Sequence, residues 1–355
     1  WKYGRKKNIL ILNDTKTGHL RQSQAVAEIL INHLKDRVRD LRINILEVKF
    51  KNKLSRLALD LSSSLAGKYQ CQGCLWCLKT FLHPDSYKSL TELAPDIIIS
   101  CGSSLAAVNY VLSQENLSKS IVIMRPSLLS TRRFNLVIMP WHDNPPKRKN
   151  VVVSEGALNL INESYLESQA EALKEQINVT KELILGLLVG GDTKNFCLAQ
   201  DVIQEVISQI KASLEKYDGQ ILTTTSRRTP PGIESLLKEE LRDYPNSRLL
   251  IIANENNPAY AVGGILALSK IVVVSPESIS MISEAASSGK YIVVFKSPID
   301  RRHSRFLNNM ASKKYIYLCK ARQISSVIKK ILEEKPEINV LKDNLRVSEA
   351  LKRLI

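Results

Sequence analysis

The chain has 355 residues, a length greater than one hydrophobic core usually organises. Its hydrophobic content of 44% is enough to build two cores. Its formal net charge of +16 is concentrated in residues 1–155, which hold 24 Lys and Arg against 12 Asp and Glu. No apolar run approaches the roughly 20 residues of a membrane-spanning helix, and the six cysteines do not form the dense framework of a disulfide-stapled secreted domain. We therefore expect two domains with reduced thiols, in the cytoplasm. The chain starts at Trp1, so an anchor upstream remains open.

Short apolar strands alternate with longer helical segments, which is the pattern of parallel sheets covered by helices. Six strands are expected in the first half, at residues 8–13, 43–49, 96–101, 120–124, 135–139 and 151–153. A polar helical stretch follows, and five more strands are expected at 182–189, 219–224, 248–253, 271–275 and 291–295. The pattern predicts an α/β protein with two Rossmann-like domains, 1–160 and 182–320, joined by a linker helix at 161–181 and followed by C-terminal helices at 321–355.

Ligands of open parallel sheets bind beyond the carboxyl ends of the strands, so residues that follow each expected strand are site candidates. The first strand leads to Asp14, Gly18 and His19 at a helix start, where backbone amides favour an anion. Asp14 or His19 is a candidate general base. His142 and Asp143, in the proline-rich and charged loop at 140–149, are two further candidates. As an alternative, Asp14 is only a turn residue and His19 only a surface imidazole.

In the second half of the chain, candidate site residues again follow the first two expected strands. Gly190 and Gly191 precede Asp192 and Thr193 in a turn that suits a phosphate, although it lacks the Walker spacing and the full dinucleotide fingerprint. The next strand leads to Thr225–Pro230, which contains Ser226, Arg227 and Arg228. Because guanidinium groups match phosphate oxygens bidentately, this loop is a candidate diphosphate clamp.

The strand at 271–275 is followed by a run of hydroxyl residues at a helix start. Ser278 and Ser280 can hold a phosphate together with the helix amides, and the Glu284 carboxylate can bind ribose hydroxyls. An ordinary capped helix is the alternative.

Cys71, Cys74 and Cys77 form a C-x2-C-x2-C run that can supply three thiolates to a metal or an iron–sulfur cluster if Cys101 or another group completes the site. Their apolar surroundings favour a helix with ordinary buried cysteines instead, and we expect no metal. The same stretch, 71–82, lies among basic residues and contains Trp76. It can either dip into a membrane interface or be a buried core helix.

Taken in order, several motifs resemble the "elongated mitochondria" family of mitochondrial-fission proteins in plants and its bacterial homologues. They are D-x-K-x-G-H-x-x-Q at 14–22, P-x-H-D at 140–143, G-A-L at 156–158, G-G-D at 190–192, T-S-R-R-T-P at 225–230, Asn257-Pro258 and E-S-I-S-M-I-S-E-A at 277–285. The resemblance implies a fold of the GT-B glycosyltransferase type. Two departures are Glu277, where the family usually has Asp, and the turn at 102–104, which lacks the expected arginines.

The residues and the resemblance together predict transfer of a sugar from a nucleotide-activated donor to a membrane-associated glycolipid or polysaccharide precursor, with no cofactor. The basic first domain is expected to meet an anionic membrane surface or a lipid-linked acceptor, so the chain would be peripheral to the inner face of the membrane. The residues expected to bind the donor are Gly18, Gly190, Gly191, Asp192, Thr193, Ser226, Arg227, Arg228, Asn257, Ser278, Ser280 and Glu284.

Two other functions are weighed against sugar transfer. A non-catalytic adaptor on the same fold is the main alternative, since plant members are known as organelle-fission adaptors. Specific nucleic-acid binding is not expected, because no recognised module is present and only 6% of the residues are aromatic. The basic charge can also be merely that of lysine-rich solvated helices.

Overall fold

The computed structural model describes residues 6–35, 37–38, 40–67, 75–126 and 128–355. The chain divides into two compact units. Unit 1 contains the chain up to Leu160 together with Lys342–Ile355, and unit 2 contains Ile161–Leu341. Among the described residues, no helix has both the length and the apolar character needed to cross a bilayer.

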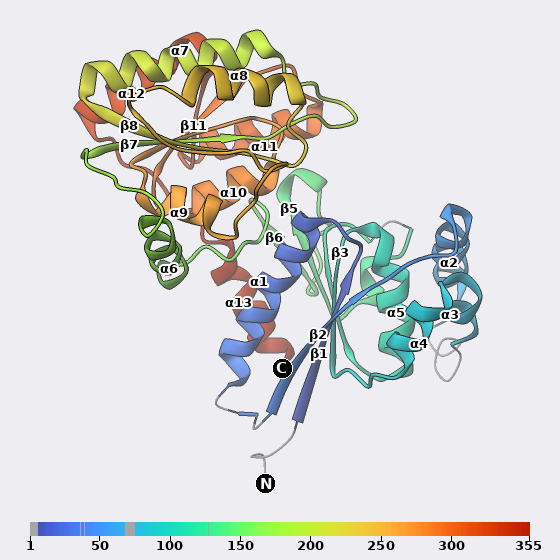
Figure 1. Cartoon of the computed structure of the whole chain (residues 1–355). Helices are drawn as coiled ribbons and strands as arrows, with labels where there is room; N and C mark the ends of the chain where they lie inside the picture. The colour runs from blue at the N-terminus through green and yellow to red at the C-terminus, as the bar shows by residue number, and fades with distance from the viewer. Residues whose placement is uncertain (1–5, 36, 39, 68–74, 127) are drawn as a thin grey trace. The chain divides into compact units, whose positions relative to one another are not determined.

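Unit 1 is built on a six-stranded parallel sheet with the order β2-β1-β3-β4-β5-β6. The strands are β1 (Lys6–Asn13), β2 (Asp40–Glu47), β3 (Ile97–Cys101), β4 (Lys119–Ile123), β5 (Leu136–Pro140) and β6 (Val151–Ser154). Side chains alternate between the faces of a strand, so Ile9 and Ile11 pack with one set of helices while Leu10 and Leu12 pack with another. The first set is α1 (Thr17–Leu34) and α13 (Asp343–Leu354); the second is α2 (Lys53–Leu65), α3 (Trp76–Phe81), α4 (Pro84–Thr91) and α5 (Ala106–Glu115) (Figure 1).

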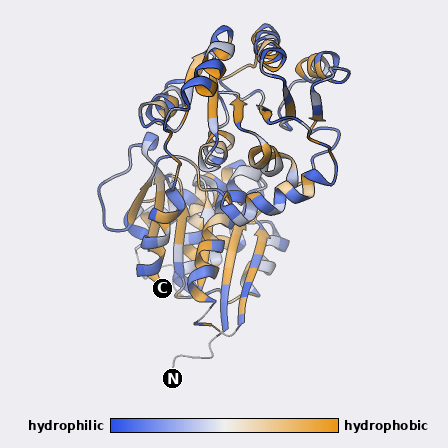
Figure 2. Ribbon diagram, turned by 90° about the vertical axis from the view of Figure 1, so that its left-hand side faces the viewer, coloured by the Kyte–Doolittle hydropathy of each residue, from blue (hydrophilic) through white to orange (hydrophobic). Residues whose placement is uncertain are grey.

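Unit 2 is a second parallel six-stranded sheet, with the order β12-β11-β10-β7-β8-β9. Its strands are β7 (Leu183–Val189), β8 (Gly219–Thr225), β9 (Ser247–Ile251), β10 (Ile271–Val274), β11 (Tyr291–Lys296) and β12 (Tyr317–Lys320). One face is covered by α7 (Gln200–Tyr217), α8 (Pro231–Leu241) and α12 (Ile324–Glu334), and the other by α6 (Glu163–Lys174), α9 (Tyr260–Leu268), α10 (Ile279–Ser287) and α11 (Arg301–Ser312). Figure 2 shows the hydrophobic strands beneath helices whose outer surfaces are largely hydrophilic. Covering helices on both faces explain why these strands read as continuous apolar runs.

The prediction of two parallel sheets with covering helices is confirmed, and all eleven expected strands are present. The twelfth, β12, was missed because it is short and lies at the edge of its sheet. The helical stretch expected as a linker holds α6, which packs on α9 inside unit 2. The C-terminal helices divide between the units: α12 packs in unit 2, whereas α13 packs on α1, where Val347 and Leu351 are fully buried.

Candidate functional site

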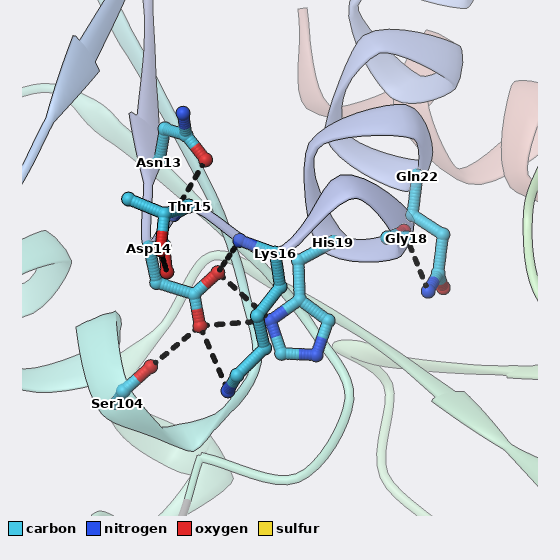
Figure 3. Close-up of polar contacts among 8 residues, drawn as sticks. All are labelled: Asn13, Asp14, Thr15, Lys16, Gly18, His19, Gln22 and Ser104. Carbon is cyan, nitrogen blue, oxygen red and sulfur yellow. Dashed lines mark hydrogen bonds and ion pairs between the residues drawn. The ribbon is translucent and has the colours of Figure 1, made fainter. Parts of the chain in front are cut away.

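In unit 1, the turn between β1 and α1 gathers polar side chains around the Asp14 carboxylate (Figure 3). His19 Nδ1 lies 2.9 Å from Asp14 Oδ2 and 3.1 Å from Oδ1. The Lys16 ammonium lies 3.1 Å from Asp14 Oδ2, and the Ser104 hydroxyl donates to the same oxygen at 3.0 Å. Ser104 belongs to a short 3-10 helix after β3, which is the neighbour of β1 in the sheet. Two adjacent strand ends therefore supply one polar cluster.

The charge of Asp14 is fixed by this cluster. Burial of the side chain, which is 8% exposed, acts to raise the pKa of the carboxyl group, but the hydrogen bond and charge of His19, with Lys16, hold that pKa well below its usual range. Asp14 is therefore ionised at neutral pH. An ionised carboxylate only accepts hydrogen bonds, so Nδ1 of His19 carries a proton and, in the neutral ring, Nε2 is left as an acceptor. Such an Asp–His pair is the arrangement of a general base whose ring is oriented by a carboxylate.

The other two predicted base candidates lie elsewhere in unit 1. His142 and Asp143 belong to a short 3-10 helix after β5, and their side chains approach to 3.9 Å. Strands β3 and β4 lie between β1 and β5, and neighbouring strands are about 4.8 Å apart. His142 and Asp143 therefore lie about 14 Å along the sheet from the Asp14 cluster. The His142 side chain is 1% exposed, whereas that of His19 is 21% exposed. The imidazole that a substrate can reach in this conformation is therefore that of His19.

In unit 2, three of the loops predicted to bind a donor follow adjacent strands. The sheet order places β7 between β10 and β8, so the turns after these strands meet at one edge. Thr229 Oγ1 donates to the Gly190 carbonyl at 2.5 Å, and the Asp192 amide donates to the Arg228 carbonyl at 3.1 Å. A side chain on Gly191 would collide with the Arg228 backbone, which explains the need for glycine there.

The amides of the Gly190-Gly191 turn are already engaged within the protein. The Gly190 amide donates to Ser275 Oγ at 2.7 Å, and the Gly191 amide donates to Glu277 Oε1 at 2.8 Å. Burial raises the pKa of the Glu277 carboxyl group, against the hydrogen bonds that it accepts from backbone amides and the Ser275 hydroxyl and against the nearby charge of Arg228. This turn therefore holds a carboxyl group of the chain itself where the sequence suggested an open phosphate cradle.

The groups that remain open to an anion in unit 2 lie beside this turn. Arg227 and Arg228 are exposed, and the Ser278 hydroxyl caps α10 by accepting from the Met281 amide at 3.4 Å. Ser280 is partly exposed in the first turn of the same helix. Exposed guanidinium groups and a helix start at the same edge of the sheet are suited to a diphosphate.

The remaining predicted donor residues fall into different surroundings. Glu284 lies on α10 and is only 7% exposed. Thr193 forms a tight turn with Phe196, and the Asp192 carboxylate accepts from the Leu198 amide at 2.8 Å. Asn257 is exposed after β9, at the edge of the sheet. In unit 1, Gly18 lies in the first turn of α1 and its carbonyl accepts from Gln22 Nε2 at 3.3 Å.

Sequence reasoning missed four residues that build these sites: Lys16, Ser104, Thr229 and Ser275. Each of these residues lies within a few positions of a strand end. The rule that ligands bind beyond the carboxyl ends of the strands, which pointed to Asp14, could therefore have identified all four. Of the cysteine motif, Cys71 and Cys74 lie outside the described residues, and Cys77 is a half-buried free thiol. Within the described ranges, no group of three or more His, Cys, Asp or Glu side chains is placed to hold a metal ion.

Comparison with known proteins gives the family. The family model described as "Mitochondrial fission ELM1" matches residues 17–355. The chain belongs to this family. It is 25% identical over 264 residues to the uncharacterized protein RP120 of Rickettsia prowazekii, covering 63% of this chain and 72% of that protein. It is 26% identical over 225 residues to the mitochondrial fission protein ELM1 of Arabidopsis thaliana, covering 56% of this chain and about half, 51%, of the plant protein.

Solved structures give the fold. The UDP-GlcNAc 2-epimerase of Neisseria meningitidis, in a structure bound to UDP-GlcNAc, is similar with a TM-score of 0.60 over 99% of both chains, at 13% identity. The spinosyn rhamnosyltransferase SpnG is similar with a TM-score of 0.50 over 98% of this chain and 96% of that one, at 11% identity. At such identities the likeness concerns the fold alone. The chain has the GT-B fold of glycosyltransferases and nucleotide-sugar epimerases.

Proposed function

We propose that the chain transfers a sugar from a nucleotide-activated donor to a membrane-associated glycolipid or polysaccharide precursor, at the inner face of a membrane. The observation that carries this proposal is the Asp14–His19 pair at the carboxyl end of β1. In sugar transfer, the acceptor hydroxyl loses its proton as its oxygen bonds to the sugar C1 and the bond from C1 to the diphosphate breaks. Nε2 of His19 is the group that takes this proton.

The leaving diphosphate carries away the electron pair of the broken bond and must be stabilised. The exposed Arg227 and Arg228 and the first turn of α10 supply positive charge and amide dipoles for it, and such groups need no metal ion to act. Several structures of similar fold are described with UDP or UDP-GlcNAc bound, which makes uridine diphosphate sugars the first donors to test.

A non-catalytic adaptor remains the second candidate, since the Arabidopsis relative is named as a mitochondrial fission protein. The polar cluster argues against it. A scaffold has no need to keep an ionised carboxylate buried beneath an imidazole whose second nitrogen is an available acceptor, because burying charge costs free energy.

The test is turnover with a purified chain. The chain is incubated with a panel of UDP-sugars and a bacterial lipid extract, and both UDP release and labelled glycolipid are measured. We expect transfer by the native chain, and a loss of about a hundredfold or more in His19→Gln with unchanged binding of UDP. His83→Gln is the matched control, because His83 also faces an aspartate, Asp85, in unit 1 but is exposed at the start of α4.

Three results would contradict the proposal in different ways. Absence of both turnover and thermal stabilisation by any nucleotide would favour the adaptor. Conversion of the UDP-sugar to an epimer without an acceptor would assign an epimerase. Equal loss in the His19 and His83 variants would remove His19 from the reaction.

A further inference from the structure

Helix α2 presents a row of leucines to solvent. Leu54, Leu57, Leu61 and Leu65 recur at intervals of three, four and four residues, so they share one side of the helix. Their exposed fractions are 76%, 48%, 47% and 85%. We call these four residues the leucine face.

The rest of α2 accounts for its attachment to unit 1. Leu59 and Ser63, on the other side of the helix, are buried, and α2 packs on α3 and α5. Leu59 is part of the core that also contains Leu78 of α3. The leucine face is therefore not needed to hold the helix in place. Four outward leucines on one short helix are a contiguous apolar surface, which soluble proteins rarely leave uncovered without a function.

Two further exposed apolar side chains lie on neighbouring segments. Trp76, at the start of α3, is 67% exposed, and Leu128 is 52% exposed. The segment that carries Leu128 is tied to α2, because Arg133 Nη2 donates to the Ser64 carbonyl at 2.7 Å. Figure 1 shows α2 and α3 together at the outer end of the helical layer that covers this face of the unit 1 sheet.

The charges around the leucine face are of one sign. Between residues 49 and 82 the sequence contains six Lys and Arg but a single acidic residue, Asp60, which is buried at 5% exposure. The cationic side chains exposed in this segment are Lys49, Lys51, Lys53, Arg56 and Lys79. An apolar helix face bordered by Lys and Arg, with a nearby Trp, is the composition of a helix that lies in a membrane interface.

The positive charge around the leucine face also indicates which partner covers it. A second copy of the chain would bring the same cations against each other, which disfavours self-association through this face. A nucleic acid would be attracted by the cations but offers little that suits four leucines. An anionic bilayer satisfies both features, because its headgroups attract the cations and its acyl region accepts the leucines.

We infer that α2 is a membrane-docking helix, whose leucine face enters the headgroup and acyl boundary of an anionic bilayer while the surrounding Lys and Arg contact the lipid headgroups. This inference rests on the membrane association in the proposed function but not on sugar transfer. The inference assigns the membrane contact to α2, with Trp76 beside the surface that inserts.

The test measures binding of the full chain to vesicles. Vesicles of phosphatidylcholine with about 30% phosphatidylglycerol are compared with pure phosphatidylcholine, at low and at high salt. We expect binding to the anionic vesicles only, weakened by salt because the headgroup attraction is screened. Leu57→Glu/Leu61→Glu should lower the partition coefficient by about tenfold or more, since it removes apolar contact and adds repulsion. Lys53→Glu/Arg56→Glu should remove the preference for anionic lipid.

Matched controls separate docking from folding and from catalysis. Leu117→Glu/Leu345→Glu alters leucines of unit 1 that are 77% and 63% exposed but belong to neither α2 nor α3, and should leave vesicle binding unchanged. The leucine variants should retain the native thermal transition, because the replaced leucines are exposed. Equal vesicle binding by the leucine-face variant and the native chain overturns the inference, as does capture by an acidic protein without any vesicle binding. Sugar transfer that survives without vesicle binding defeats this inference alone; vesicle binding without any transfer defeats only the proposed reaction.

Discussion

The imidazole of His19 lies against Gly102, whose backbone has a φ of +85°. A Cβ atom on Gly102 would come within 2.5 Å of His19 Cε1 and 2.9 Å of Nδ1. Gly102 follows β3, the strand beside β1, so the neighbouring strand end leaves the space in which the ring pairs with Asp14. Only glycine combines this positive φ with this lack of volume.

Gly102→Ala should therefore disturb the site more than the fold. We expect the added methyl group to displace His19 from Asp14 and to reduce transfer by about tenfold or more, with UDP binding unchanged. Gly289→Ala is the control, because Gly289 also has a positive φ, of +73°, but its Cβ would meet no atom closer than 3.9 Å. Both variants should also lose about 1–3 kcal/mol of stability from backbone strain. Equal activity in the two would show that the ring is not held by this contact.

Asp14→Asn should uncouple His19 from its orienting charge. We expect the rate of transfer to fall by about 10²–10⁴-fold, because an amide no longer fixes the proton on Nδ1. The pKa of Asp14 is lowered by folding, so its contribution to stability is present above the unfolded value of 3.8 and is lost as the pH falls below it. The stability advantage of the native chain over this variant should thus be present at about pH 5 and shrink below pH 4, as measured by urea unfolding. An advantage that does not change with pH would contradict the assigned ion pairs.

Arg227→Ala should weaken binding of UDP by about 1.5–3 kcal/mol, which is about 10–150-fold in the dissociation constant. The reason is the loss of an exposed guanidinium group on the loop that follows β8. Isothermal calorimetry measures the change, and Arg322→Ala, an exposed arginine of unit 2 on the short 3-10 helix before α12, serves as the control. Unchanged affinity would move the diphosphate away from this loop.

Asp60 makes the stability of the chain depend on pH in the opposite direction to Asp14. Burial raises the pKa of the Asp60 carboxyl group from 3.8 to about 6, with Arg56 opposing the shift. A raised carboxyl pKa means that the folded state loses stability as the pH rises from about 4 to about 6. Asp60→Asn should therefore be more stable than the native chain by about 1–2 kcal/mol at pH 7.5 and not at pH 4. Asp85→Asn, at a 90% exposed side chain, should show no such crossover in urea unfolding.

Much of the fold follows from local pattern. The apolar runs and the turns after them gave eleven of the twelve strands, since strand and helix periodicities are properties of neighbouring residues. The strand-end rule then led to Asp14, His19 and Arg227, because parallel strands all deliver their carboxyl ends to one edge of a sheet. The candidate residues, though not their roles, could thus be read directly.

Only the tertiary structure determines which of these residues contact one another. Sequence order does not contain the sheet order, so only the folded chain sets β7 between β10 and β8 and brings Ser104, which follows β3, to Asp14. The sequence suggested that the amides of Gly190 and Gly191 bind a phosphate. In the structure, these amides donate to the side chains of Ser275 and Glu277, which are far away in the sequence. The leucines of α2 have a spacing that fits a buried face equally well, and packing through Leu59 decides that the other four face solvent. Hydrogen-bond partners and burial depend on residues far apart in the chain, and this is why local sequence identifies the groups but not their contacts.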